Sequence, residues 1–326
     1  MEKKDLRIIF MGTPEFAVGT LSRLVEGGYN VVAVVTQPDK PVGRHQDKLQ
    51  ASAVKQYALA HSIPVLQPVK MKDPDFVERL ADLKADLQVV VAFRMLPEIV
   101  WAMPRFGTFN VHAALLPQYR GAAPINWAVI NGETQTGVTT FFIDKDIDTG
   151  RIIMKRTFDI PDDADVEYVY DGLMKLGADI AVETVDMVLD NDGNVQAQEQ
   201  EALIPTSEPL HPAPKIFKET CQICWDKPAK TVYDFIRGLS PYPGAWTTLH
   251  KDQKATELKI YKAAKTGKPV GDAKPGSIET TKKALYMACA DEWLEILSLQ
   301  LAGKKRMEAS AFINGNKGLA DCTVGE

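Results

Sequence analysis

The residues best suited to chemistry lie between positions 110 and 148. Asn110 and His112 alternate at the end of a predicted strand, so their side chains share one face of it. Asp148 stands downstream, in an Ile-Asp-Thr-Gly turn between two further strand-like runs. These groups suit acyl transfer to an amine, because an amide can donate to an oxyanion, an imidazole can move protons and a carboxylate can orient the imidazole.

Each of these residues also has an ordinary structural interpretation. His112 can be a partly buried histidine with satisfied hydrogen bonds, Asn110 can cap a strand end and Asp148 can be a simple turn residue. A second candidate site is the turn after the first strand, where a dinucleotide-binding protein has three glycines. Pro14 and Ala17 occupy the second and third glycine positions, which argues against a dehydrogenase.

The elements that must position these residues alternate along the first part of the chain. This alternation predicts an α/β fold with a doubly wound, mostly parallel sheet, whose active site lies at the carboxyl ends of the strands. An apolar run over 87–93 is typical of a central strand buried on both faces. The predicted strands span 6–11, 31–36, 87–93, 107–112, 137–143 and 151–158, and the predicted helices span 14–26, 52–61, 73–83, 125–130 and 165–190.

The pattern changes after residue 190. Residues 191–215 are polar and contain four prolines, as linkers often do. A helix over 228–238 is then followed by short strand-like runs between Gly and Pro turns, which predict a small OB-like β-barrel. We therefore expect a catalytic domain over 1–190, a linker over 191–215 and a barrel domain over 216–326. The barrel strands are predicted at 245–250, 256–263, 276–280, 284–289 and 293–299.

Charge differs between the two ends of the chain. Residues 216–326 carry 17 Lys and Arg against 13 Asp and Glu, although the whole chain carries 38 against 43. A basic end on an acidic chain favours contact with a polyanion through that end, but an ordinary solvated surface has the same composition.

Composition also limits where the protein works. No stretch approaches the roughly 20 apolar residues of a membrane span, and no signal-peptide cleavage site follows the N-terminus, so we predict a cytoplasmic protein without membrane contact. Four cysteines fit a reducing compartment. Cys221 and Cys224 form a CxxC pair without a second pair of ligands, so we predict no metal.

The stretch NVHAALLPQYRGAAPINWAVINGE, followed by TGVTTFFIDKDIDTG, resembles the active-site signature of the 10-formyltetrahydrofolate-dependent formyltransferases. The resemblance implies formyl transfer from 10-formyltetrahydrofolate without a metal, with Asn110, His112 and Asp148 as catalytic residues. It also implies folate binding by Arg94, Met95 and Leu96 and by Ala114, Leu115, Leu116 and Pro117. Two departures are visible: Ala114 replaces the family's usual serine, and Phe93-Arg94-Met95 replaces its usual Tyr-Gly-Leu.

Further segments resemble those members of the family that formylate initiator methionyl-tRNA. They are IIFMGTPEFAVGTL, TQPDKPVGR, IPVLQP and LSLQLAGKKRM. This resemblance implies direct attack of the methionyl amine on the formyl carbon, and no obligate protein partner. It places tRNA contacts at Lys40, Arg44 and Lys48 of an insertion over 38–49, and at Lys304, Lys305 and Arg306 of the barrel.

Two alternatives remain open at this point. One is a formyltransferase of the same fold that acts on a sugar amine or a glycinamide nucleotide. The other is a non-catalytic RNA-binding protein that keeps an inactive α/β domain. The basic end of the chain argues against the first, and the combination of Asn110, His112 and Asp148 argues against the second.

Overall fold

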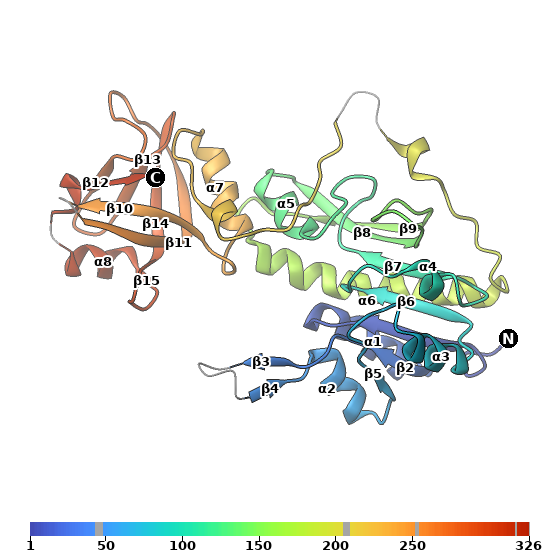
Figure 1. The fold of residues 1–326 in the computed structure, drawn as a ribbon. Coiled ribbons are helices and arrows are strands. Elements are labelled where there is room, and N and C mark those ends of the chain that lie inside the picture. The colour runs from blue at the N-terminus through green and yellow to red at the C-terminus, as the bar shows by residue number, and fades with distance from the viewer. Residues whose placement is uncertain (43–47, 205–208, 252–253, 317, 326) are drawn as a thin grey trace. The chain divides into compact units, whose positions relative to one another are not determined.

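A computed structural model describes residues 1–42, 48–204, 209–251, 254–316 and 318–325 (Figure 1). Contacts divide the chain into two compact units. Unit 1 comprises Met1–Gly121, Thr136–Asp159 and Tyr170–Pro212, and unit 2 comprises Ala122–Gln135, Ile160–Val169 and Ala213–Glu326. Two short segments from the middle of the chain therefore pack with the C-terminal part.

Unit 1 is built on a seven-stranded sheet in the order β5-β2-β1-β6-β7-β8-β9. The pairs from β5 to β7 are parallel, and β8 runs antiparallel to β7. The strands are β1 (Arg7–Gly12), β2 (Asn30–Val35), β5 (Val65–Leu66), β6 (Leu87–Val91), β7 (Thr108–His112), β8 (Gln135–Phe142) and β9 (Ile152–Asp159). The predicted doubly wound, mostly parallel sheet is thus confirmed.

The strand order reverses beside β1, which has β2 on one side and β6 on the other. In such sheets ligands bind outside the carboxyl ends of the strands at this reversal. All five residues of β6 are buried, in agreement with a strand covered on both faces. The helices of this part are α1 (Glu15–Glu26), α2 (Ala53–Ala60), α3 (Pro74–Asp82), α4 (Glu98–Trp101) and α6 (Val166–Asp190).

Local chemistry explains where the surface helices begin. The Asp73 side chain accepts a hydrogen bond from the Asp75 N–H, and Pro74 occupies the first turn of α3, where no N–H is needed. Phe76 and Leu80, four residues apart, then face the core beside Val90 of the sheet. The helix predicted over 73–83 agrees with these bounds to within one residue at each end.

Unit 2 contains a curled antiparallel sheet in the order β12-β13-β14-β11-β10-β16, with β15 beside β14. This half-barrel confirms the predicted small β-barrel class. Its strands are β10 (Ala245–Lys251), β11 (Lys254–Pro269), β12 (Ile278–Thr280), β13 (Leu285–Ala288), β14 (Glu292–Leu301), β15 (Met307–Glu308) and β16 (Thr323–Gly325), and its helices are α5 (Pro124–Ile130), α7 (Ala229–Gly238) and α8 (Ala309–Gly315).

One glycine lets the two edges of this sheet approach. Ser277 forms a bridge with Thr323, and the Val324 N–H donates to the Gly276 carbonyl at 2.8 Å. Gly276 has φ +84°, and a Cβ there would lie 2.1 Å from the Val324 carbonyl oxygen. A side chain would therefore both strain the backbone and push the edges apart.

The segment predicted as a linker, 191–215, makes contacts within unit 1. Gln198 pairs with Ile152 of β9 through two backbone hydrogen bonds of 2.8 Å. A short 3-10 helix over Gln200–Leu203 follows, and residues 205–208 lie outside the described part of the chain. In the described residues, no helix has the length and hydrophobicity that crossing a membrane requires.

Candidate active site

His112, the last residue of β7, is held by a backbone carbonyl. Its Nε2 lies 2.9 Å from the Tyr119 oxygen, and because that oxygen only accepts, Nε2 carries a proton and donates it. Nδ1 faces the Asp148 carboxylate, with 3.8 Å between Nδ1 and Oδ2. Both side chains are largely buried, at 6% and 13% exposed. The carboxylate therefore lies at ion-pair distance from a ring whose orientation the Tyr119 carbonyl sets.

Asp148 is positioned by its turn and by the loop after β7. The Gly121 N–H donates to Asp148 Oδ2 at 2.9 Å. Asp148 itself has φ +57°, a left-handed conformation that costs free energy in any residue except glycine. Gly150, two residues on, cannot carry a side chain, since a Cβ would lie 1.7 Å from the Phe142 carbonyl oxygen.

Asn110 lies on the same face of the sheet as His112. In the register of β7 with β8, Asn110 faces Phe141 and His112 faces Thr139. The Asn110 Oδ1 atom is buried and has no hydrogen-bond partner within the described residues. Since buried polar atoms are almost always satisfied, this amide oxygen is the kind of acceptor that a hydrogen-bond donor of a bound ligand completes.

The loop 114–117 is fixed from below by Thr139 of β8. The Thr139 hydroxyl donates to the Ala114 carbonyl at 2.7 Å and accepts from the Leu116 N–H at 3.1 Å. The side chains of Ala114, Leu116 and Pro117 are buried, while Leu115 is half-buried. Any ligand on this loop would consequently meet its backbone and Leu115 more than its other side chains.

The loop 94–96 follows β6 and is held through the Arg94 side chain. The guanidinium donates to the Val69 carbonyl at 2.9 Å and also to the Pro68 carbonyl. Burial lowers the pKa of the Arg94 guanidinium from its usual value. Met95 is 66% exposed and Leu96 is buried. The Arg94 side chain therefore stabilises the position of the loop. The backbone amides and carbonyls of 94–96 are the groups of this loop that could bind a ligand.

The residues predicted to contact tRNA lie on both units. Lys40 is exposed at the start of a hairpin made by β3 (Lys40–Val42) and β4 (Lys48–Gln50). Arg44 lies outside the described residues, as does the side chain of Lys48.

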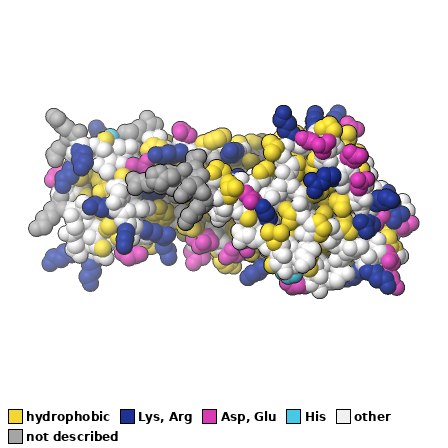
Figure 2. All heavy atoms as spheres, turned by 60° about the horizontal axis from the view of Figure 1, so that its bottom comes forward, with side chains coloured by type: hydrophobic (Ala, Val, Ile, Leu, Met, Phe, Trp, Pro, Cys, Tyr) yellow, Lys and Arg dark blue, Asp and Glu magenta, His cyan; other side chains and the backbone are white. Residues whose placement is uncertain are grey.

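In unit 2, Lys304, Lys305 and Arg306 are exposed on the turn between β14 and β15. Arg306 stacks over the Tyr261 ring, 4.5 Å from its centre. On the face that Figure 2 shows, Lys and Arg side chains are interspersed with acidic ones. The turn 304–306 is a solvent-exposed group of three cations.

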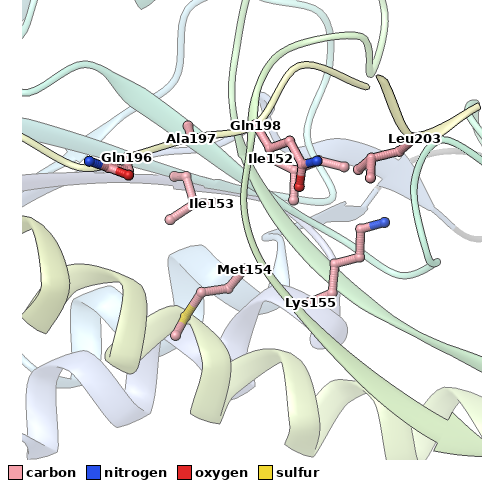
Figure 3. A pocket seen from close by; sticks show the side chains of 8 residues that line it. All are labelled: Ile152, Ile153, Met154, Lys155, Gln196, Ala197, Gln198 and Leu203. Carbon is pink, nitrogen blue, oxygen red and sulfur yellow. The ribbon is translucent and has the colours of Figure 1, made fainter. Parts of the chain in front are cut away.

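A cavity of about 600 Å³ lies beside β9. Figure 3 shows its lining from Ile152–Lys155, Gln196–Gln198 and Leu203. The residues that line this cavity do not include His112, Asn110 or Asp148. We therefore place the candidate active site at these three polar residues and not at the cavity. In the described residues, no group of three or more His, Cys, Asp and Glu side chains gathers as a metal site would.

The sequence pattern did not identify several residues that shape this site. They are Tyr119, whose carbonyl holds the imidazole, Thr139, which fixes the 114–117 loop, and Gln200, which bonds the Asp148 turn. Tyr119 acts through its backbone and Thr139 is one threonine in a strand. The role of Thr139 could have been inferred only from the register of β7 with β8, in which Thr139 is paired with His112.

A comparison with known families identifies the class. Residues 6–185 match the formyl transferase family and residues 215–317 match the formyl transferase C-terminal domain. The chain belongs to the formyl transferase family. A protein named methionyl-tRNA formyltransferase from Parabacteroides distasonis is 60% identical, with all of both chains covered. One of the same name from Flavobacterium johnsoniae is 48% identical, covering 97% of each chain.

Solved structures with the same fold are more distant in sequence. An N-formyltransferase from Helicobacter canadensis, in complex with folinic acid and dTDP-3-aminofucose, gives a TM-score of 0.63 at 19% identity, covering 94% of this chain and 100% of that one. HypX from Aquifex aeolicus, in complex with tetrahydrofolic acid, gives 0.62 at 19% identity, covering 96% of this chain and 48% of that one. At these identities the likeness shows the fold alone.

Proposed function

We propose that the protein transfers a formyl group from 10-formyltetrahydrofolate to the α-amine of initiator methionyl-tRNA. The observation that carries this proposal is the full-length similarity, at 60% identity, to a protein named methionyl-tRNA formyltransferase. Asn110, the buried His112 and the largely buried Asp148 carboxylate supply the polar groups that acyl transfer to an amine needs.

In the proposed reaction the deprotonated methionyl amine attacks the formyl carbon. The Asn110 amide and the Nδ1–H of protonated His112 donate to the oxyanion, while the Tyr119 carbonyl holds the ring through Nε2. Asp148, 3.8 Å from Nδ1, stabilises the imidazolium by charge. Asp148 assists removal of the proton that the attacking nitrogen must lose, and the folate nitrogen takes up a proton as its bond to the formyl carbon breaks and then leaves. No strong base is required, because a free α-amine titrates near ~7.7–8.0.

Folate binding is assigned to two loops of unit 1. The backbone of Arg94, Met95 and Leu96 offers amides and carbonyls at the end of β6, where ligands of doubly wound sheets bind. The loop Ala114–Pro117 follows His112 directly and has a backbone fixed by Thr139. In this proposal Ala114 takes the place of a serine at little cost, because its side chain is buried.

The acceptor is tested by offering the protein several amines with 10-formyltetrahydrofolate. The acceptors are initiator methionyl-tRNA, elongator methionyl-tRNA and a dTDP-linked amino sugar, and the product is followed with a labelled formyl group. We expect formylation of the initiator substrate alone. Formylation of the sugar, with none of the tRNA, would favour the alternative sugar-amine function, and no transfer to any acceptor would refute an enzymatic role.

For the tRNA contact, we expect Arg44→Ala to raise KM for methionyl-tRNA more than KM for folate. Loss of one phosphate contact should also reduce the slope of log KM against log salt by roughly one, because fewer counterions are released on binding. The matched control is Arg79→Ala, at an exposed arginine of α3. Equal tRNA kinetics and salt slopes in the two variants would contradict a role for Arg44.

A further inference from the structure

The Gln200 side chain is fully buried, and residues of the candidate active site and its loops form hydrogen bonds with all of its amide donors and acceptors. Its Nε2 donates to the Asp148 carbonyl at 2.9 Å and to the Gly150 carbonyl at 2.7 Å. Its Oε1 accepts from Arg120 Nε at 3.1 Å and from Arg120 Nη2 at 2.7 Å. None of the side chain is exposed, although it comes from a polar segment.

The two loops that Gln200 joins are the ones that place the Asp148 carboxylate. One is the turn Asp148–Gly150, whose first residue has φ +57°. The other contains Arg120, and the next residue, Gly121, donates its N–H to Asp148 Oδ2 at 2.9 Å. The amide therefore fixes the backbone of the turn against the same loop that binds the carboxylate.

The segment that carries Gln200 is anchored on both sides. Before it, Gln198 and Ile152, the first residue of β9, exchange two backbone hydrogen bonds of 2.8 Å, and both residues are labelled in Figure 3. After it, Leu203 packs against the small apolar cluster of Leu116, Phe141 and Ile152. Because the residues on both sides of Gln200 are held in place, the position of its side chain is also fixed.

Removing the amide would leave two buried carbonyls without their donor. An unsatisfied buried carbonyl is unfavourable, and the left-handed turn would also lose the contacts that hold its backbone. The turn can relax by moving Asp148, which is the residue that faces His112 Nδ1.

We propose that Gln200 is a positioning residue, which acts through the Asp148 turn to hold the carboxylate beside His112. The proposal rests on the assignment of Asp148 to the reaction made above. Gln200 is not a catalytic residue, since within the described part of the chain its side chain bonds to Asp148, Gly150 and Arg120 and to no reacting group. A segment expected to be a mere connection is thereby part of the active-site architecture.

Two substitutions separate the donor and acceptor parts of the amide. Gln200→Glu keeps an acceptor for Arg120 and removes both donors, while Gln200→Met removes all bonds at similar size. We expect kcat to fall about 10- to 100-fold in both, the range typical when a supporting hydrogen bond or a near-ångström placement is lost. KM for both substrates should stay within about twofold. Gln198→Glu and Gln198→Met, at an exposed side chain of the same segment, serve as controls.

A double-mutant cycle with Asp148→Asn distinguishes positioning from general support. If Gln200 acts through the carboxylate, Gln200→Glu should lower kcat in the otherwise unchanged protein and have little further effect in Asp148→Asn. Equal losses in both backgrounds, or unchanged kcat in Gln200→Glu, would overturn the proposal. Circular dichroism and thermal unfolding check each variant, and if Gln200→Met does not fold, Gln200→Glu decides alone. Full activity of Asp148→Asn would instead refute the proposed role of Asp148, whatever Gln200 does.

Discussion

Replacing His112 by alanine should lower kcat for formylation by about 100- to 1000-fold or more, the usual cost of losing one oxyanion donor. Asn110→Ala should fall in the same range, because its amide faces the same site. Both variants should still bind folate, since the loops 94–96 and 114–117 are held by Arg94 and Thr139 and not by the imidazole. Single-turnover formylation measures the first effect and titration with folate measures the second.

The control for this result is His61→Ala. His61 is an exposed histidine that stacks on Tyr57 at the end of α2. The His61→Ala variant should retain normal kcat. This result would show that the loss in His112→Ala is specific to His112 and not a general effect of removing an imidazole. Near-normal kcat in either His112→Ala or Asn110→Ala would refute the assignment of that residue to the reaction.

Gly150→Ala is expected to damage both activity and stability. A Cβ at this position would lie 1.7 Å from the Phe142 carbonyl oxygen, a backbone atom at the end of β8 that cannot rotate away. The turn must shift, and Asp148 shifts with it. We expect kcat to fall by about 100-fold, as for a misplacement of about 1 Å. The free energy of unfolding should fall by about 1–3 kcal/mol, as in other overpacked sites.

Gly315→Ala provides the comparison for that variant. Gly315 ends α8, and a Cβ there would meet nothing within 4 Å. In urea denaturation and formylation assays, Gly150→Ala should lose stability and kcat, whereas Gly315→Ala should lose neither. Wild-type stability together with wild-type kcat in Gly150→Ala would mean that the Asp148 turn tolerates a shift, against the geometry described above.

Most elements of the fold were predictable because their signals are local. The helix α6 (Val166–Asp190) and the central strand β6 (Leu87–Val91) are long or strongly apolar, and their predicted ranges, 165–190 and 87–93, differ by at most two residues at either end. The elements β5, α4, β15 and β16 were missed because each has only two to four residues. So short a run carries no periodicity, and pairing with a neighbouring strand decides its conformation.

The division into compact units was less predictable. The helix α5 (Pro124–Ile130) follows the candidate active-site loop in sequence but packs with unit 2, where it contacts α7. Its Asn126 side chain donates to the Gly238 carbonyl at 2.8 Å. Nothing in a seven-residue apolar helix says which core it joins, since apolar burial is not directional.

The sequence by itself determined which groups could react. Asn110 and His112 share a face because strand side chains alternate, and Asp148 lies on a turn because Thr-Gly ends the run between two strands. Those statements need only the positions of neighbouring residues. They do not require any knowledge of how distant segments meet.

Only the tertiary structure decided how these groups are held. The imidazole is oriented by the Tyr119 carbonyl, and the turn of Asp148 is tied by Gln200, which lies 52 residues further along the chain. The Arg94 guanidinium donates hydrogen bonds to the carbonyls of Pro68 and Val69, so it holds its own loop in place. Hydrogen bonds to backbone carbonyls have no residue-type signature in the acceptor, and therefore no sequence pattern could reveal them.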